Sequence, residues 1–159
     1  MTNFVDPSPS AGLPGEAHTS QLNDLGAVRT YSDGSVYIYL SGVASCIAGS
    51  VVVYNLATFA PTLIVTGLKG PVAVATAAVT AAKFGWFMIV GAAASTVRTA
   101  VTTNVALFAG GVAGFVDVAA VKGDQVRSMY ARTPGGANGG TTTLHVNRAF
   151  IGASNETTG

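Results

Sequence analysis

Few residues of this 159-residue chain have the chemistry for acid–base catalysis or metal binding. The two histidines, His18 and His145, have no Cys, Asp or Glu partner at ligand spacing, so we expect both to be solvated polar residues. Between residues 35 and 155 the only carboxylates are Asp117 and Asp124, too few to suggest a paired acid and base. The sequence therefore predicts no catalytic, cofactor-binding or metal-ligating residue, and no enzyme.

Three further motifs resemble chemical sites but are better explained otherwise. The single cysteine, Cys46, has no partner for an intrachain disulfide and is predicted to be a small buried hydrophobic residue. Gly110–Gly114 resembles part of a phosphate loop but lacks a following Lys-Ser/Thr, which favours a turn. Asn155-Glu156-Thr157 matches a glycosylation acceptor, but the polar N-terminus indicates no secretion signal, so the match is attributed to chance.

The elements that would position any functional residue are organised around Phe84–Gly91, which holds the only tryptophan. In a strand, Phe84, Trp86, Met88 and Val90 share one face, and Phe87 and Ile89 share the other. Neither face is suited to water, so the strand is predicted to be an inner wall or to be covered by a second subunit. Phe84, Trp86 and Met88 are the expected core anchors. Gly85 and Gly91 indicate a bend or a close backbone approach.

The rest of the body is predicted to consist of about ten short strands with Gly-rich turns. A helix competes only over residues 72–82, where β-branched residues favour a strand followed by a turn. Residues 92–95 are small and predict a bend, and Asp33-Gly34 predicts a two-residue hairpin turn. The fold class is therefore all-β, a compact β-barrel or β-sandwich. The expected strands are 27–31, 36–40, 51–54, 62–66, 72–76, 84–91, 97–101, 105–108, 112–116, 126–131 and 142–150.

The second strand of the hairpin is amphipathic. Val36, Ile38 and Leu40 point to one face, and Tyr37 and Tyr39 point to the other. The two tyrosines are candidate partner contacts, although exposed tyrosines are also common on strands without any such role.

Residues 1–24 have the composition of an extended N-terminal arm, because they are rich in proline, glycine, serine and threonine. Phe4, Val5 and Leu13 are its candidate contact residues, and the alternative is a tail with incidental apolar residues. The β-body is expected over residues 25–152 and a loose C-terminal tail over residues 153–159.

The composition favours association with other protein. Charged residues make up 9% of the chain, against roughly 25% in a typical domain, and the mean hydropathy is +0.48. Burying surface against partners is the expected solution. Residues 35–68 are uncharged, but Gly, Pro and Asn interrupt them, so no membrane span is predicted. A net charge of +1 argues against nucleic-acid binding.

Several strand-and-turn phrases, in their order along the chain, resemble the capsid decoration (cement) proteins of tailed bacteriophages. The phrases are Leu25–Val28, Ser32–Tyr39, Ala48–Asn55, Gly70–Val74, Lys83–Gly91 and Thr143–Phe150. The resemblance implies an all-β body that assembles as a trimer on the outer surface of the virion capsid. There it would bind and stabilise the shell of the major capsid protein, and its extended arms would tie neighbouring capsomers together. The resemblance carries over no catalytic residue, and residues 1–24 lie outside it.

Two other hypotheses remain open. The chain fits another virion structural subunit, such as a head fibre, tail or adaptor component. It also fits a surface carbohydrate-binding module, in which Tyr37, Tyr39 and Tyr130 would form a stacking platform.

Overall fold

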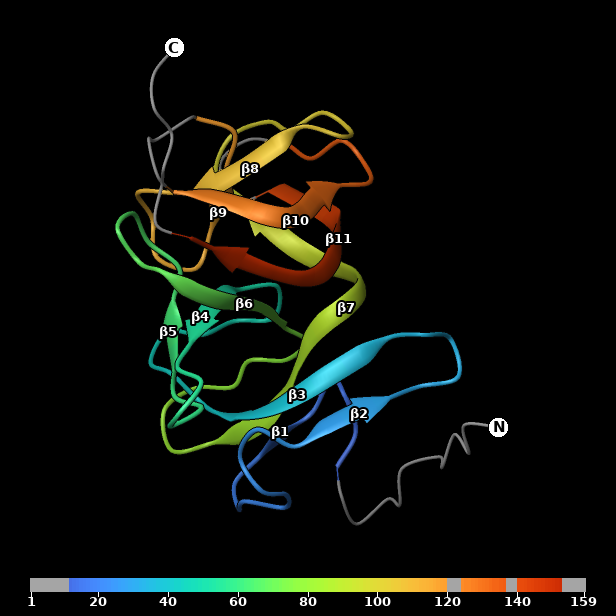
Figure 1. Ribbon diagram of the computed structural model, residues 1–159, viewed down its shortest axis with the longest axis vertical. Helices are drawn as coiled ribbons and strands as arrows, with labels where there is room; N and C mark the ends of the chain where they lie inside the picture. Colours follow the sequence, from blue (N-terminus) through green and yellow to red (C-terminus); the bar gives the residue numbers. More distant parts are fainter. Residues whose placement is uncertain (1–11, 120–123, 137–139, 153–159) are drawn as a thin grey trace.

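The protein is all-β, as predicted. The structure, a computed structural model, describes residues 12–119, 124–136 and 140–152 (Figure 1). Within them lie eleven strands: β1 (Ala17–His18), β2 (Val28–Thr30), β3 (Val36–Ser41), β4 (Val51–Tyr54), β5 (Pro61–Leu63), β6 (Gly70–Ala75), β7 (Phe84–Val97), β8 (Ala106–Ala109), β9 (Val116–Asp117), β10 (Gln125–Ala131) and β11 (Gly140–Ile151). Phe4, Val5 and the predicted tail, residues 153–159, lie outside the described residues.

All eleven strands belong to one mixed sheet in the order β2-β3-β7-β9-β8-β10-β11-β6-β4-β5, with β1 paired to β7. The sheet folds over itself because β7 also pairs with β11 and β6. It fits the predicted sandwich class rather than a closed barrel. In Figure 1, β8 to β11 lie at the top, β1 to β3 lie at the bottom, and β7 runs between the two groups.

The long strand β7 changes partner along its length. From Phe84 to Val90 it pairs with β3, and from Val90 to Val97 it pairs with β11. Gly91 follows the point of transfer and has a φ of 132°. A Cβ atom there would lie 3.1 Å from the sulfur of Met88 and 3.3 Å from Cβ of Ser35. Only glycine meets both the backbone angle and the space, which accounts for the close approach predicted at this position.

The bend predicted over residues 92–95 is wrong. Residues 92–95 continue the strand, and Val97 is its last residue. The separate strand predicted over residues 97–101 is absent, although Val101 forms an isolated bridge with Gly135. The reason is pairing: Ala92 to Val97 each have a partner residue on β11. The pairing with β11 outweighs the weak strand preference of alanine. The local sequence gives no sign of this pairing, because β11 lies much later in the chain.

Two cores lie on either side of β4 and β6. The large core receives Val51 and Val53 from β4, whereas the small core receives Val52 and Tyr54. On β6 the same alternation sends Val72 and Val74 to the large core and Ala73 and Ala75 to the small core. On β7, Met88 belongs to the large core, and Phe87 and Ile89 belong to the small core. These strands are apolar on both faces because each separates two cores.

The predicted hairpin is present, but its turn is one residue longer than expected. β2 pairs with β3 from Val28 against Ile38 to Thr30 against Val36. The N–H of Gly34 donates to the carbonyl of Tyr31 at 3.0 Å, and Gly34 has a φ of 83°. Asp33 is not among the residues with positive φ, so the loop has three residues with glycine at the left-handed position.

The other predicted strands differ mainly at their ends. Residues 70–75 form a strand as favoured over a helix, and β5 ends at Leu63 rather than at residue 66. Of the predicted strand 112–116, only the last residue is extended, in the two-residue strand β9.

Candidate partner-binding site at the base of the N-terminal arm

The second half of the predicted arm is packed onto the body. β1 lies beside the first residues of β7, with Ala17 opposite Gly85 and His18 opposite Phe84. A Cβ atom on Gly85 would lie 2.7 Å from Cγ2 of Val79 and 3.2 Å from the carbonyl oxygen of Glu16. Glycine at this position therefore lets the arm approach β7, which is the close backbone approach predicted from the sequence.

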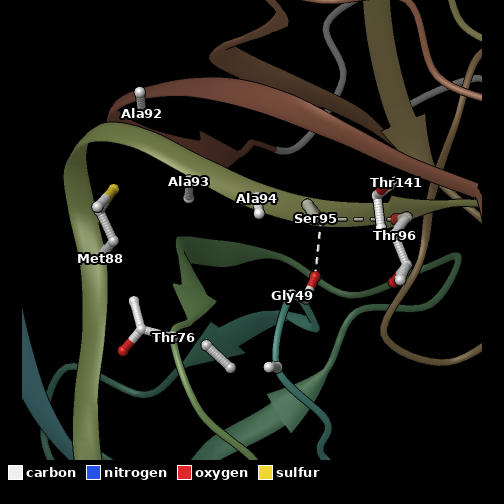
Figure 2. A pocket seen from close by; sticks show the side chains of 11 residues that line it. Gly49, Thr76, Met88, Ala92, Ala93, Ala94, Ser95, Thr96 and Thr141 are labelled. Atoms are coloured by element: carbon white, nitrogen blue, oxygen red, sulfur yellow. Dashed lines mark hydrogen bonds between the residues drawn. The ribbon is translucent and has the colours of Figure 1, made fainter. Parts of the chain in front are cut away.

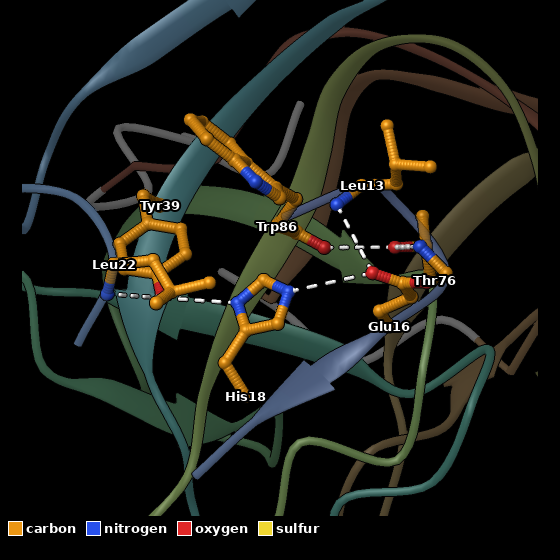
Figure 3. A network of polar contacts seen from close by, with 8 residues as sticks. Leu13, Glu16, His18, Leu22, Tyr39, Thr76 and Trp86 are labelled. Atoms are coloured by element: carbon orange, nitrogen blue, oxygen red, sulfur yellow. Dashed lines mark hydrogen bonds and ion pairs between the residues drawn. The ribbon is translucent and has the colours of Figure 1, made fainter. Parts of the chain in front are cut away.

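An aromatic cluster lies where β1 meets β3 and β7 (Figure 3). The ring of Tyr39 stacks with His18 and Phe84 at centroid distances of 5.8 and 6.5 Å. It meets Trp86 edge-on at 4.9 Å. Tyr39 and Trp86 are both 0% exposed. The expectation that Tyr39 lies on an exposed face is therefore wrong, because the arm covers that face.

The Tyr39 hydroxyl fastens the arm at two points. It accepts a hydrogen bond from the N–H of Leu22 at 3.2 Å and lies 3.0 Å from Nδ1 of His18. Both contacts are satisfied when the hydroxyl donates its proton to Nδ1, which puts the ring proton on Nε2. Nε2 lies 3.9 Å from a carboxylate oxygen of Glu16. The side chain of His18 is only 9% exposed, so the expectation of a solvated residue is wrong.

Polar contacts from Arg29 of β2 and from Thr76, each hydrogen-bonded to an arm residue, also surround Trp86. The guanidinium of Arg29 lies 5.0 Å from the centroid of the Trp86 ring and donates to the side chain of Asn23 at 3.1 Å. The hydroxyl of Thr76 donates to the carbonyl of Trp86 at 2.8 Å and accepts from the N–H of Gly15 at 3.1 Å. The face of β7 that was expected to need an inner-wall position or a second subunit is thus covered largely by this chain's own arm.

The residues predicted as contacts or anchors are divided among several places. Phe84, Trp86 and Tyr39 belong to the aromatic cluster, whereas Met88 packs in the large core. Tyr37 is half-buried beside the large core, and Leu13 is 44% exposed at the start of the described arm. Sequence reasoning missed His18, Asn23 and Arg29. The sequence signal was Gly85 between two aromatic residues, which indicates that another backbone passes there.

A cavity of about 430 Å³ lies between β7, the end of β6 and the loop before β4 (Figure 2). Its wall is made of small side chains, and the hydroxyl of Ser95 crosses it to donate to the carbonyl of Gly49 at 2.7 Å. None of its lining residues is titratable, so it offers room for an apolar group rather than acid–base chemistry. The lining residues are Ala48, Gly49, Ala75, Thr76, Met88, Ala92, Ala93, Ala94, Ser95, Thr96 and Thr141.

The two carboxylates and the cysteine of the body make structural contacts. Asp124 accepts hydrogen bonds from Lys69 and from the N–H of Gly67, both at 3.0 Å. Burial raises the pKa of the Cys46 thiol, as expected for a side chain that is 1% exposed.

Asp117 is held by hydrogen bonds at the end of β9. Burial favours a higher pKa for the Asp117 carboxyl, but hydrogen bonds from Thr99, Ala119 and Val118, with the charge of Arg98, hold that pKa below its usual value. The carboxylate therefore closes the turn after β9 by accepting these N–H and hydroxyl groups.

Within the described residues, no three His, Cys, Asp or Glu side chains gather in a way that could hold a metal ion. The same part of the chain contains no helix long and apolar enough to cross a membrane. Comparison with protein-family models, with curated proteins and with solved structures gave no match. The resemblance to decoration proteins stays a prediction.

Proposed function

We propose that this protein decorates and stabilises a bacteriophage capsid by binding the outer surface of the major capsid protein shell as a homotrimer. The observation that carries the proposal is the arm base, residues 12–24, which is held on the body by a short β-ladder and by hydrogen bonds. Residues 15–22 are tied to β3, to β7 and to Thr76, so the described part of the arm is held at a fixed point on the body. The eleven residues before the described part span at most about 40 Å when extended, and we propose that they contact a neighbouring subunit.

The surface of the body supports a binding role. Large apolar side chains are exposed on it, among them Leu56 at 69% and Val28 at 51%. Together with the low charge of the chain, they offer contact area without chemistry. A shell that binds many such copies gains stiffness from their number, even where each contact contributes modestly.

Self-association is expected from the surface of the body and not from the outer face of β7. The apolar outer face of β7 no longer requires a second subunit, since Tyr39 and Trp86 are buried within one chain. What still favours self-association is the exposed apolar surface and the low charge. Sedimentation at micromolar concentration should show a trimer. A stable monomer would contradict this part of the proposal, and a ring would favour a tail or adaptor subunit.

The decisive test removes only the segment before the fastened base. Deletion of residues 2–22 would uncover Tyr39 and Trp86, so the informative truncation is residues 2–11. The truncated protein should keep its circular dichroism and its Trp86 fluorescence. When both proteins are added to undecorated particles, fewer truncated copies should bind. A double substitution, Phe4→Ser with Val5→Ser, should give the same loss.

The matched control is Thr2→Ser with Asn3→Ser, which changes the same segment without removing an apolar side chain. It should leave occupancy unchanged. Equal occupancy and equal heat resistance for all variants would show that attachment resides in the body and that the arm makes no contribution.

A further inference from the structure

A second concave site lies where β7 transfers from β3 to β11. The strands β3 and β11 pair with successive parts of β7 and diverge from it at this point. Their side chains form the walls of a groove of about 410 Å³, and residues of β7 between Met88 and Ala92 form its floor. The tip of the β2–β3 hairpin closes one side, and the end of β10 with β11 closes the other. Of the three tyrosines considered for a stacking platform, only Tyr37 lines this groove, which contains no residue of the N-terminal arm.

Aromatic rings stand on both walls of the groove. Tyr37 of β3 lines one wall, and the ring of Tyr31 meets it edge-on at 5.3 Å. His145 of β11 lines the other wall and stacks on Tyr130 at 4.9 Å with an interplanar angle of 30°. Each ring that faces the groove is thus supported by a second ring behind it, which limits its rotation. The groove therefore has one aromatic residue on each wall that could contact a ligand.

Two opposite charges complete the lining. Asp33 at the hairpin tip accepts from the N–H and the hydroxyl of Ser35 at 2.9 and 2.6 Å, both at Oδ1, which leaves Oδ2 for a ligand. The side-chain hydrogen bond from Ser35, followed by its backbone hydrogen bond, lowers the pKa of Asp33, so this group is a carboxylate at neutral pH. Opposite it, Arg132 is exposed and contributes up to five N–H donors.

We infer that this groove binds a neutral saccharide. A pyranose ring has a flat apolar face that stacks on an aromatic ring, and its adjacent hydroxyl groups both donate and accept hydrogen bonds. A carboxylate on one side accepts such hydroxyls, and a guanidinium on the other side donates to them. The two charges cancel, so the lining does not favour a charged ligand. Tyr39, which the sequence suggested for a stacking platform, is buried and takes no part, whereas Tyr37 lines the groove and Tyr130 supports His145.

The test uses the full-length protein on a glycan array and, in solution, titration with cellobiose, maltose and diacetylchitobiose at millimolar concentration. We expect binding to neutral glycans, with NMR shifts at Tyr37 and His145. Tyr37→Ala and Arg132→Ala should each weaken binding about tenfold. Tyr37→Phe keeps the ring and should bind nearly as well as the wild type. Arg127→Ala, which removes an exposed arginine of β10 outside the groove, should have no effect.

Several results would overturn the inference. These are the absence of binding to every array glycan and every probe, a preference for sialylated over neutral glycans, or full binding by both alanine variants. Tyr37→Phe and Arg132→Ala leave the cores intact, so a loss of folding in Tyr37→Ala alone does not prevent a decision. The test needs no capsid, and its outcome is independent of the decoration proposal.

Discussion

Tyr39→Phe separates the attachment of the arm from the stability of the body. The substitution keeps the ring that packs against Trp86 and removes only the hydroxyl that contacts His18 and Leu22. Loss of a hydrogen bond whose buried partner is left unsatisfied costs about 1 to 3 kcal/mol. The side chain of His18 is nearly buried, so the loss of its hydrogen bond should cost an amount in that range. Leu22 is 43% exposed, so its N–H can form a hydrogen bond with water instead. We expect a total near 2 kcal/mol, which corresponds to a roughly thirtyfold larger open fraction of the arm.

Amide hydrogen exchange measures this opening directly. The amides of β1 and of Leu22 should exchange about thirtyfold faster in Tyr39→Phe, while the amides of β10 and β11 keep their protection. The control is Tyr37→Phe, which removes a tyrosine hydroxyl two residues away on the same strand and should leave the arm unchanged. If the arm amides of Tyr39→Phe keep wild-type protection, the hydroxyl does not fasten the arm.

Three further substitutions test other parts of the structure. Trp86→Ala should reduce the free energy of unfolding in denaturant by about 3 to 5 kcal/mol, and Trp86→Phe should reduce it clearly less. An unchanged denaturation midpoint for Trp86→Ala would contradict the burial of Trp86. Gly91→Ala should lower the free energy of unfolding by about 1 to 3 kcal/mol, because Gly91 has a φ of 132° and the added Cβ would meet Met88. Gly34→Ala should lower it less, because no atom lies near the added Cβ. The lowered pKa of Asp117 gives stability that is fully present above its unfolded value of about 3.9 and is lost as the pH falls through the folded value. The free energy of unfolding, measured between about pH 6 and pH 2, should therefore depend less on pH in Asp117→Asn than in the wild type. The same dependence on pH in both proteins would show that Asp117 does not have this role.

The sequence predicted those features that depend on neighbours along the chain. Val36, Ile38 and Leu40 alternate with tyrosines, and this period was sufficient to place a strand and its core-facing side. Asp33-Gly34 was sufficient to place a hairpin. By contrast, the strand character of residues 92–95 comes from β11, about fifty residues later, and no local pattern contains that pairing.

The candidate site was partly predictable for the same reason. Trp86 was recognised as a large apolar side chain on the central strand, and Gly85 indicated a close backbone. What covers them was not predictable, because His18 and Arg29 are polar and sit in segments with little periodicity. Their burial follows from the hydroxyl of Tyr39 and the ring of Trp86, which supply a hydrogen-bond partner and a cation–π contact in the folded chain only.

The attachment of β1 to the start of β7 has a mechanical consequence. Tension applied to the arm enters the body at Phe84 and Gly85, the first residues of a strand that also pairs with β3, β6, β9 and β11. The load is therefore spread over several ladders and both cores. The junction itself has two paired residues, the contacts of the Tyr39 hydroxyl, and the hydrogen bonds of Gly15 with Thr76 and of Asn23 with Arg29. We expect tension to detach the arm before the body unfolds, because β1 has two residues paired with β7, whereas β3 has six and β11 has eight.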